Sequence, residues 1–92
     1  MHKSIIEFTK YENKVQGETH VRAKLHITGC DMNESEFKEF RKKLCENDKY
    51  TIGDMGTDSG QNPFFLTATY DNMYDDTYDE LERLESEGWK WK

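Results

Sequence analysis

The stretch His20-Val21-Arg22-Ala23-Lys24-Leu25-His26-Ile27-Thr28 decides the fold of this chain. Apolar and polar residues alternate along it without a break, which is the period-2 pattern of a β-strand. Its four apolar side chains therefore lie on one face and its polar side chains on the other. One face packs on a core and the other meets water, as antiparallel sheets allow. We predict a half-buried strand of an antiparallel sheet.

The residues on either side of this strand predict a hairpin before it and a helix after it. Residues 4–11 alternate as a strand, with Ile6 and Phe8 on one face, and the polar residues 12–17 predict a hairpin loop. After Gly29, Asn33 and Glu36 have the spacing of a capping box. The helix that follows carries an apolar stripe of Phe37, Phe40 and Leu44.

The second half of the chain repeats the order of elements. Tyr50-Thr51-Ile52 predicts a third strand, residues 54–62 a connection, and residues 63–70 a fourth strand. A helix follows, with Tyr74, Tyr78, Leu81 and Leu84 as its apolar stripe and Asp76 or Thr77 as its cap. Trp89-Lys90-Trp91-Lys92 alternates and can form a short terminal strand with both rings on one side.

These elements predict an α+β fold of the order β-β-α-β-β-α, with an optional final β. We expect one domain spanning residues 1–92, built as a two-layer sandwich. An antiparallel four-stranded sheet, with a possible short fifth C-terminal strand, carries two helices on one face. The expected core is Val21, Ala23, Leu25, Ile27, Phe40, Leu44, Leu66, Leu81 and Leu84.

Composition limits the classes of protein that this chain can belong to. The 92 residues are 35% charged and 34% hydrophobic, and 13% aromatic content argues against disorder. No apolar run reaches the roughly 18 residues of a membrane span, and the N-terminal residues lack a signal-peptide pattern. Two cysteines without a secretion signal indicate reduced thiols. We therefore expect a cytoplasmic protein that makes no membrane contact.

The net charge of −6 hides a strong asymmetry along the chain. Residues 1–53 hold 10 basic and 9 acidic residues, whereas residues 54–87 hold 10 acidic residues and only Arg83 as a base. Such a segment repels nucleic acid and attracts basic protein surfaces.

The acidic residues gather at the last helix, which is the main candidate site. Helical spacing places Asp75, Asp79 and Glu82 on one side, with few cations between them. A row of carboxylates on a rigid helix can present itself to a phosphate-binding groove in place of nucleic acid. The plain alternative is a solvated helix face. The candidate partner-binding residues are Asp71, Asp75, Asp76, Asp79, Glu80 and Glu82.

The polar face of the 20–28 strand is the alternative site. His20, Arg22, Lys24 and His26 form a line of basic or titratable side chains, and Phe65 and Tyr11 can supply stacking aromatics. Such a face can hold nucleic acid, or it can be a salt-bridged outer sheet face.

Metal and catalytic motifs are not found. His20 and His26 lie roughly 20 Å apart on a strand, and Cys30 and Cys45 lack partners at metal-ligand spacing. Cys45 at a helix C-terminus is a poor nucleophile. We expect no metal, no cofactor and no enzymatic activity.

The acidic segment Asp71-Asn72-Met73-Tyr74-Asp75-Asp76-Thr77-Tyr78-Asp79-Glu80-Leu81-Glu82, with the small size and α+β order, resembles small acidic phage-encoded inhibitors of anti-CRISPR or anti-restriction type. The resemblance implies a protein partner with a basic groove, such as a nuclease or a CRISPR or restriction effector, in the host cytoplasm. The alternatives are a nucleic-acid-binding or regulatory module and a homodimeric accessory protein that pairs through an edge strand or the Trp pair. The protein is expected to be a monomer or a homodimer.

Overall fold

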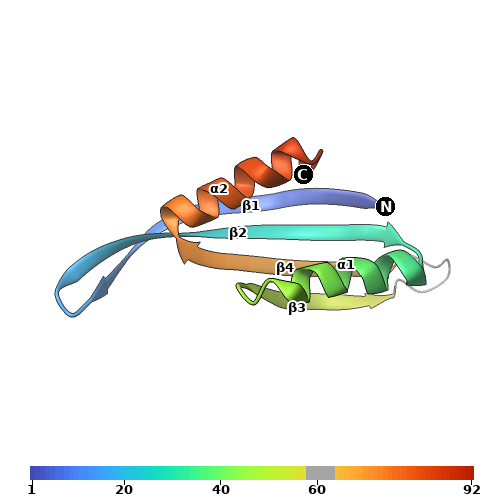
Figure 1. Ribbon diagram of the computed structural model, residues 1–92, viewed down its shortest axis with the longest axis horizontal. Helices are drawn as coiled ribbons and strands as arrows, with labels where there is room; N and C mark the ends of the chain where they lie inside the picture. Colours follow the sequence, from blue (N-terminus) through green and yellow to red (C-terminus); the bar gives the residue numbers. More distant parts are fainter. Residues whose placement is uncertain (58–63) are drawn as a thin grey trace.

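The computed structural model describes residues 1–57 and 64–92 of the chain (Figure 1). The order of elements follows the predicted β-β-α-β-β-α-β order. The elements are β1 (His2–Val15), β2 (Glu18–Met32), α1 (Glu34–Glu46), β3 (Tyr50–Thr57), β4 (Phe64–Met73), α2 (Tyr74–Ser86) and β5 (Lys90–Trp91).

The strands form one five-stranded sheet in the order β3-β4-β2-β1-β5. The four long strands are antiparallel to their neighbours, as expected. The sheet as a whole is mixed, because the short β5 pairs parallel with β1 at Ser4 and Ile5. The prediction of a purely antiparallel sheet is therefore correct only for β1 to β4.

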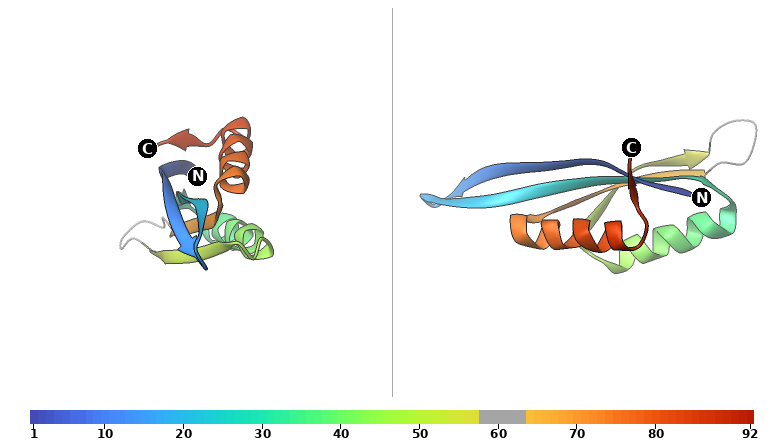
Figure 2. Two further views of the ribbon diagram at one scale, coloured as in Figure 1. Left: turned by 90° about the vertical axis from the view of Figure 1, so that its left-hand side faces the viewer. Right: turned by 90° about the horizontal axis from the view of Figure 1, so that it is seen from above.

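The β1–β2 hairpin is much longer than predicted. Pairing continues to Val15 and Glu18, so most of the expected 12–17 loop is strand. Only Gln16 and Gly17 form the turn, with φ of 53° and 81°. Positive φ at both central residues is the type I′ geometry, whose twist matches that of a hairpin. Beyond the last β2–β4 pair, the hairpin continues as a two-stranded arm of residues 12–21 (Figures 1 and 2).

A bulge in β1 changes the predicted faces of that strand. The register shifts between Ile5 and Glu7, which leaves Ile6 as the extra residue. Ile5 is fully buried and Phe8 packs against the core, so the predicted pairing of Ile6 with Phe8 on one face is wrong. A single inserted residue reverses the alternation, and period-2 reasoning cannot detect it.

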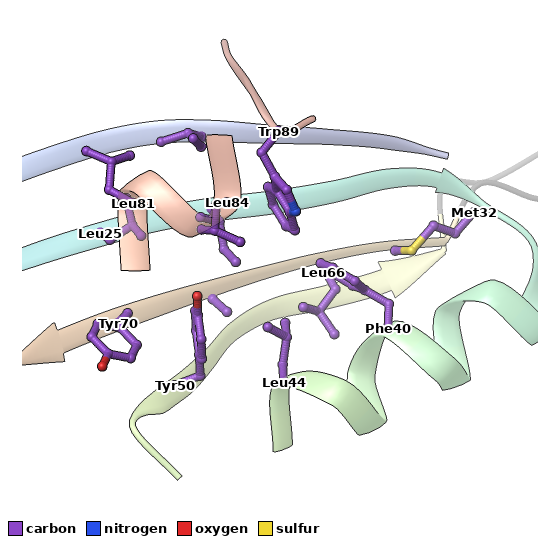
Figure 3. Close-up of a cluster of buried hydrophobic side chains, with 13 residues drawn as sticks. Leu25, Met32, Phe40, Leu44, Tyr50, Leu66, Tyr70, Leu81, Leu84 and Trp89 are labelled. Atoms are coloured by element: carbon purple, nitrogen blue, oxygen red, sulfur yellow. The ribbon is translucent and has the colours of Figure 1, made fainter. Parts of the chain in front are cut away.

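Both helices cover the same face of the sheet, as the view from above in Figure 2 shows. Eight of the nine predicted core residues are buried between the two layers. Figure 3 shows the core cluster, with Leu25, Leu81 and Leu84 among the labelled residues. Val21 is only partly buried, because the last β4 partner of β2 is opposite Arg22 and Val21 lies in the arm. The core also contains Ile5, Met32, Tyr50, Ala68, Tyr70 and Trp89, which are not in the predicted core list.

The two helices begin in different ways. The side chain of Asn33 accepts a hydrogen bond from the Glu36 N–H at 2.8 Å, and the Glu36 carboxylate accepts one from the Asn33 N–H at 3.3 Å, which confirms the capping box of α1. Helix α2 starts directly after β4 with Met73 at its N-cap and no side-chain cap. The predicted capping by Asp76 or Thr77 is therefore wrong.

Two further predictions concern the C-terminal tryptophans and the connection between β3 and β4. Trp89 is buried whereas Trp91 is half-exposed, so the two rings do not share one environment. Of the predicted 54–62 connection, residues 54–57 belong to β3, and residues 58–62 lie outside the described part of the chain. Neither of the described helices is long and apolar enough to cross a membrane.

Candidate functional site

The outer face of α2 is an acidic surface. The helix carries six acidic residues and one basic residue, Arg83. Asp75, Asp79 and Glu82 are exposed and separated by steps of four and three residues. Such steps correspond to a rise of about 6 and 4.5 Å along the helix axis. We call these three residues the acidic face.

Buried contacts on the opposite side of α2 hold the acidic face in place. Leu81 and Leu84 are part of the core, and Thr77 is fully buried. The Thr77 hydroxyl donates a hydrogen bond to the backbone carbonyl of Ala23 on β2, at 3.2 Å. After the helix, Gly88 has a φ of 95° and Trp89 N donates to Leu84 O at 3.0 Å. This left-handed C-terminal turn directs Trp89 into the core.

In the described part of the chain, the carboxylates of the acidic face have no cationic partner. Within residues 1–57 and 64–92, no Lys, Arg or His nitrogen lies within 4.0 Å of Asp75, Asp79 or Glu82. Asp76 is also exposed and accepts a hydrogen bond from Asn72 Nδ2 at 3.3 Å. The acidic face therefore meets solvent as uncompensated negative charge.

Glu80, which was predicted as a site residue, lies on a different side of the helix. Its side chain is only 12% exposed and pairs with Arg83. The hydroxyl of Tyr50 on β3 donates to Glu80 Oε1 at 2.9 Å. Burial, followed by the neighbouring Glu80 carboxylate, raises the pKa of Tyr50 far above its usual value. Glu80 thus links α2 to the sheet and is not part of the acidic face.

Arg83 is already engaged by two carboxylates. Its guanidinium pairs with Glu80 and donates to Glu87 Oε1 at 2.7 Å. The hydrogen bond to Glu80 raises the pKa of Arg83 above its ordinary value. The one base of α2 therefore pairs with the largely buried Glu80 and with the exposed Glu87 just after the helix, and it does not pair with the acidic face.

Asp71 belongs to the opposite side of the molecule. It lies on β4, and its carboxylate accepts a hydrogen bond from the Tyr11 hydroxyl at 2.7 Å. Arg22 Nη2 lies 3.3 Å and Lys24 Nζ 4.0 Å from the same carboxylate. The hydrogen bond to Tyr11, together with Asp71, raises the pKa of Arg22. Asp71 is in the predicted partner-binding set, but the structure does not place it beside the acidic residues of α2.

The open face of the sheet, opposite the helices, holds the residues of the alternative site. Arg22, Lys24 and His26 alternate with buried residues of β2, as predicted, and His20 Nε2 lies 3.7 Å from Glu18. A shallow recess of about 230 Å³ lies among Lys24, His26 and their neighbours, and Glu7 is one of its walls. The face carries both signs of charge.

The two aromatic residues proposed for stacking on this face do not come together. Tyr11 reaches Asp71, whereas Phe65 pairs with Gly56 near the far end of β4. Six residues of an extended strand separate Phe65 from Asp71, or roughly 20 Å. Tyr11 and Phe65 therefore lie too far apart to stack on neighbouring bases as one surface.

A groove that the sequence did not predict lies between the two helices. It has a volume of about 490 Å³, and the aromatic and aliphatic side chains of Phe40, Leu44, Leu84 and Trp89 line it together with Tyr50. Charged side chains also line it, among them Glu39 and Lys43 of α1 and Arg83 of α2. Helical periodicity places each apolar stripe but does not show the distance between two helices, so no signal in the sequence indicates this groove.

The described residues contain no group of three or more His, Cys, Asp or Glu side chains arranged to hold a metal ion. Cys30 and Cys45 are both free thiols. Comparisons of the chain with protein families, curated proteins and solved structures found no match.

Proposed function

We propose that this protein is a non-enzymatic binding protein that inhibits a nucleic-acid-handling partner, such as a nuclease or a CRISPR or restriction effector. The acidic face of α2 occupies the basic groove in which the partner holds nucleic acid. Its carboxylates stand in for backbone phosphates, whose charges follow each other about every 3.4 Å along one strand of a duplex. Carboxylates at about 4.5–6 Å steps on a helix fall on the same scale.

The proposal depends mainly on one contrast between two charged surfaces. The basic residues of the open sheet face are paired with an acid, whereas the acidic face of α2 is not paired with a base in the described part of the chain. Arg22 and Lys24 on the open sheet face share the carboxylate of Asp71. Asp75, Asp79 and Glu82 have no such partner in the described part of the chain. Ordinary surface helices gain stability from mixed charges at i, i+4 spacing. A basic partner surface supplies the compensation that α2 lacks.

Pre-organisation also supports the proposal. The anchoring of α2 through Thr77, Leu81 and Leu84 fixes the helix backbone that carries the three carboxylates before a partner arrives. Groups that are already ordered lose less conformational entropy on binding. Complementary charge accelerates the encounter with a basic partner.

The alternative is a nucleic-acid-binding or regulatory module that uses the open sheet face. The mixed charge of that face, with Asp71 at its centre and Glu7 beside His26, weakens its attraction for phosphates. The two proposals make opposite predictions for binding to nucleic acid, so one assay separates them.

The test measures both activities on one set of proteins. A labelled single-stranded oligonucleotide is titrated with the protein at about 150 mM salt, where non-specific binders have Kd values of roughly 10⁻⁴–10⁻⁶ M. In parallel, the protein is added to DNA cleavage reactions of a panel of CRISPR and restriction nucleases. We expect inhibition of at least one nuclease and no micromolar binding to the oligonucleotide.

Matched variants assign the activity to a surface. Replacing Asp75 and Asp79 by Asn and Glu82 by Gln should raise the half-inhibitory concentration roughly tenfold or more, because charge pairs across an interface contribute strongly. The control, Arg22→Gln with Lys24→Gln, should inhibit like the unmodified protein. Micromolar binding to the oligonucleotide that only the control variant loses would overturn the proposal in favour of the sheet face.

A further inference from the structure

Within residues 1–57 and 64–92, no strand covers one edge of the sheet over much of its length. On the side of β1 away from β2, β5 pairs only with Ser4 and Ile5, and Lys92 N donates to Ile5 O at 2.9 Å. Between Glu7 and Val15, no strand of residues 1–57 or 64–92 lies on that side. We call this stretch the free edge. Unpaired strand edges are templates for pairing with another chain unless a device prevents it.

The opposite edge of the sheet has such a device. Strand β3 is bulged between Ile52 and Met55, so its ladder is irregular. The free edge of β1 lies after the bulge of that strand and pairs with β2 in unbroken register from Glu7 to Val15. The two edges therefore differ in their capacity to accept a further strand.

The direction of the backbone groups on the free edge follows from the hairpin turn. Because Gln16 and Gly17 form a two-residue turn, Val15 and Glu18 flank it as a hydrogen-bonded pair. Hydrogen-bonded and non-hydrogen-bonded pairs alternate from there. The N–H and C=O groups of the even-numbered residues Phe8, Lys10, Glu12 and Lys14 thus face away from β2.

We propose that the free edge pairs antiparallel with the free edge of a second copy of this chain, about a two-fold axis at Tyr11. In this register Lys10 lies opposite Glu12 of the second copy, and Glu12 lies opposite its Lys10. Registers centred on Lys10 or on Glu12 place two like charges opposite each other, which destabilises a strand pair. Charge complementarity thus selects the register centred on Tyr11.

This register also satisfies the backbone groups. The four even-numbered residues oppose even-numbered residues of the second copy, so each pair exchanges two hydrogen bonds, or about eight in all. The ladder joins the two sheets into one continuous sheet. The interaction is independent of the acidic face, and it goes beyond the proposed function.

A half-exposed aromatic cluster beside the free edge gains cover in the dimer. The Phe8 ring lies 6.0 Å from the ring of Tyr74 and 6.2 Å from that of Tyr78, which is 41% exposed. Phe8 lies opposite Lys14 of the second copy in the proposed register. The arm of the second copy, residues 12–21, therefore runs beside this cluster, and exposed aromatic groups are common anchors of interfaces.

The axis at Tyr11 is free of obstruction from its own side chain. Tyr11 leans across β2 to reach Asp71 and Arg22, at 2.7 and 3.3 Å, and so points away from the free edge. Lys10 Nζ lies 4.5 Å from the centre of the Tyr74 ring, so the first turn of α2 lies near Lys10. From there α2 runs toward the C-terminus, away from the arm (Figure 1). The two helices of a dimer thus extend in opposite directions.

The first experiment measures mass against concentration by sedimentation or light scattering. We expect concentration-dependent assembly to twice the 11.0 kDa of the chain. Glu12→Lys should raise the dissociation constant at least tenfold, because it opposes Lys10 on both sides of the axis. The double variant Lys10→Glu with Glu12→Lys should restore assembly. Glu12→Pro should abolish assembly and leave the hairpin intact, because the N–H that it removes faces away from β2.

The second experiment tests the register with a symmetric cross-link. In a background of Cys30→Ser and Cys45→Ser, Tyr11→Cys should form an intermolecular disulfide with oxidised glutathione, because Cα atoms of a non-hydrogen-bonded pair lie about 4.5 Å apart. The control Asn13→Cys should not, because its copies lie roughly 14 Å apart.

The outcomes decide the proposal in either direction. Loss of assembly in Glu12→Pro, restoration in the charge-swapped variant and cross-linking through Tyr11→Cys support it. Circular dichroism verifies that each variant is folded. A protein that remains at 11.0 kDa up to millimolar concentration overturns the proposal, and so does a dimer that Glu12→Pro leaves unchanged.

Discussion

The guanidinium of Arg22 lies 3.3 Å from the carboxylate of Asp71, although 49 positions separate the two residues in the chain. They meet because β2 and β4 are neighbours and Lys24 pairs directly with Asp71 across the ladder. One acid from the acidic part of the sequence is thereby used to neutralise the basic strand. Of the nine other acidic residues in the 54–87 segment, six lie on α2.

The Arg22–Asp71 pair should contribute modestly to stability. Both side chains are about one-third exposed, at 30% and 35%, so solvent screens their attraction. A double-mutant cycle with Arg22→Gln and Asp71→Asn should give a coupling free energy of about 0.5–1 kcal/mol in chemical denaturation. A coupling of zero would show that Tyr11, which bonds both residues, holds the cluster without the charge pair.

Gly29 should be sensitive to the addition of one methyl group. A Cβ atom there would lie 2.8 Å from Cε1 of Phe40. Gly29→Ala must displace the Phe40 ring from the core, at a cost of about 1–3 kcal/mol in the free energy of unfolding. Phe40→Leu should lower the free energy of unfolding by less in the Gly29→Ala variant than in the natural protein, because the smaller side chain relieves the clash. If the free-energy changes of the two substitutions are strictly additive, residue 29 and Phe40 do not interact in this way.

The stability of the protein should fall at high pH through Tyr50. Its pKa is raised in the folded state, first by burial and then by Glu80, so the folded state holds the proton more tightly than the unfolded chain. The resulting stabilisation is complete below the ordinary pKa of about 10 and is lost as the pH rises above it, by up to about 1.4 kcal/mol per pH unit.

Tyr50→Phe supplies the comparison for this pH dependence. The variant should be less stable than the natural protein at pH 7 by about 1 kcal/mol, because it lacks the hydrogen bond to Glu80. The difference should shrink above pH 10 in urea denaturation. A difference that stays constant up to pH 11 would show that Tyr50 does not cause the loss.

Relief of charge repulsion should stabilise α2. Asp79 lies four residues after Asp75 and three before Glu82, and like charges at these spacings destabilise a helix by about 0.2–0.5 kcal/mol per pair. Asp79→Asn should therefore raise the free energy of unfolding by a few tenths of a kcal/mol, and less so as salt is added. Asp75→Asn should raise the free energy of unfolding by less, because Asp75 lies in the first turn and interacts favourably with the helix dipole.

The sequence predicted the elements and the two-layer core well, because each of them depends on local periodicity. The alternation of 20–28 and the capping box at Asn33 indicated β2 and the start of α1 correctly. The bulge at Ile6 and the parallel pairing of β5 were not predictable. Both depend on which strand lies beside β1, and this is a property of the folded chain.

The candidate site was predicted in part for a similar reason. Helical spacing correctly grouped Asp75, Asp79 and Glu82 on an exposed face. The predicted partner-binding set also includes Asp71 and Glu80, which lie near these residues in the sequence. Tertiary contacts with Arg22 and with Tyr50 and Arg83 place them elsewhere. Proximity along the chain does not reveal the partner that a side chain finds on another strand.

The most direct test of the acidic face is the rate at which the protein associates with its partner. A nuclease that the protein inhibits is immobilised, and association is followed at about 50 and 300 mM salt, where screening differs strongly. We expect the variant with Asp75→Asn, Asp79→Asn and Glu82→Gln to associate more slowly than the natural protein and with a weaker dependence on salt. The variant with Arg22→Gln and Lys24→Gln should match the natural protein. Normal association of the helix variant, together with loss of association in the sheet variant, would show that the open sheet face, and not α2, binds the partner.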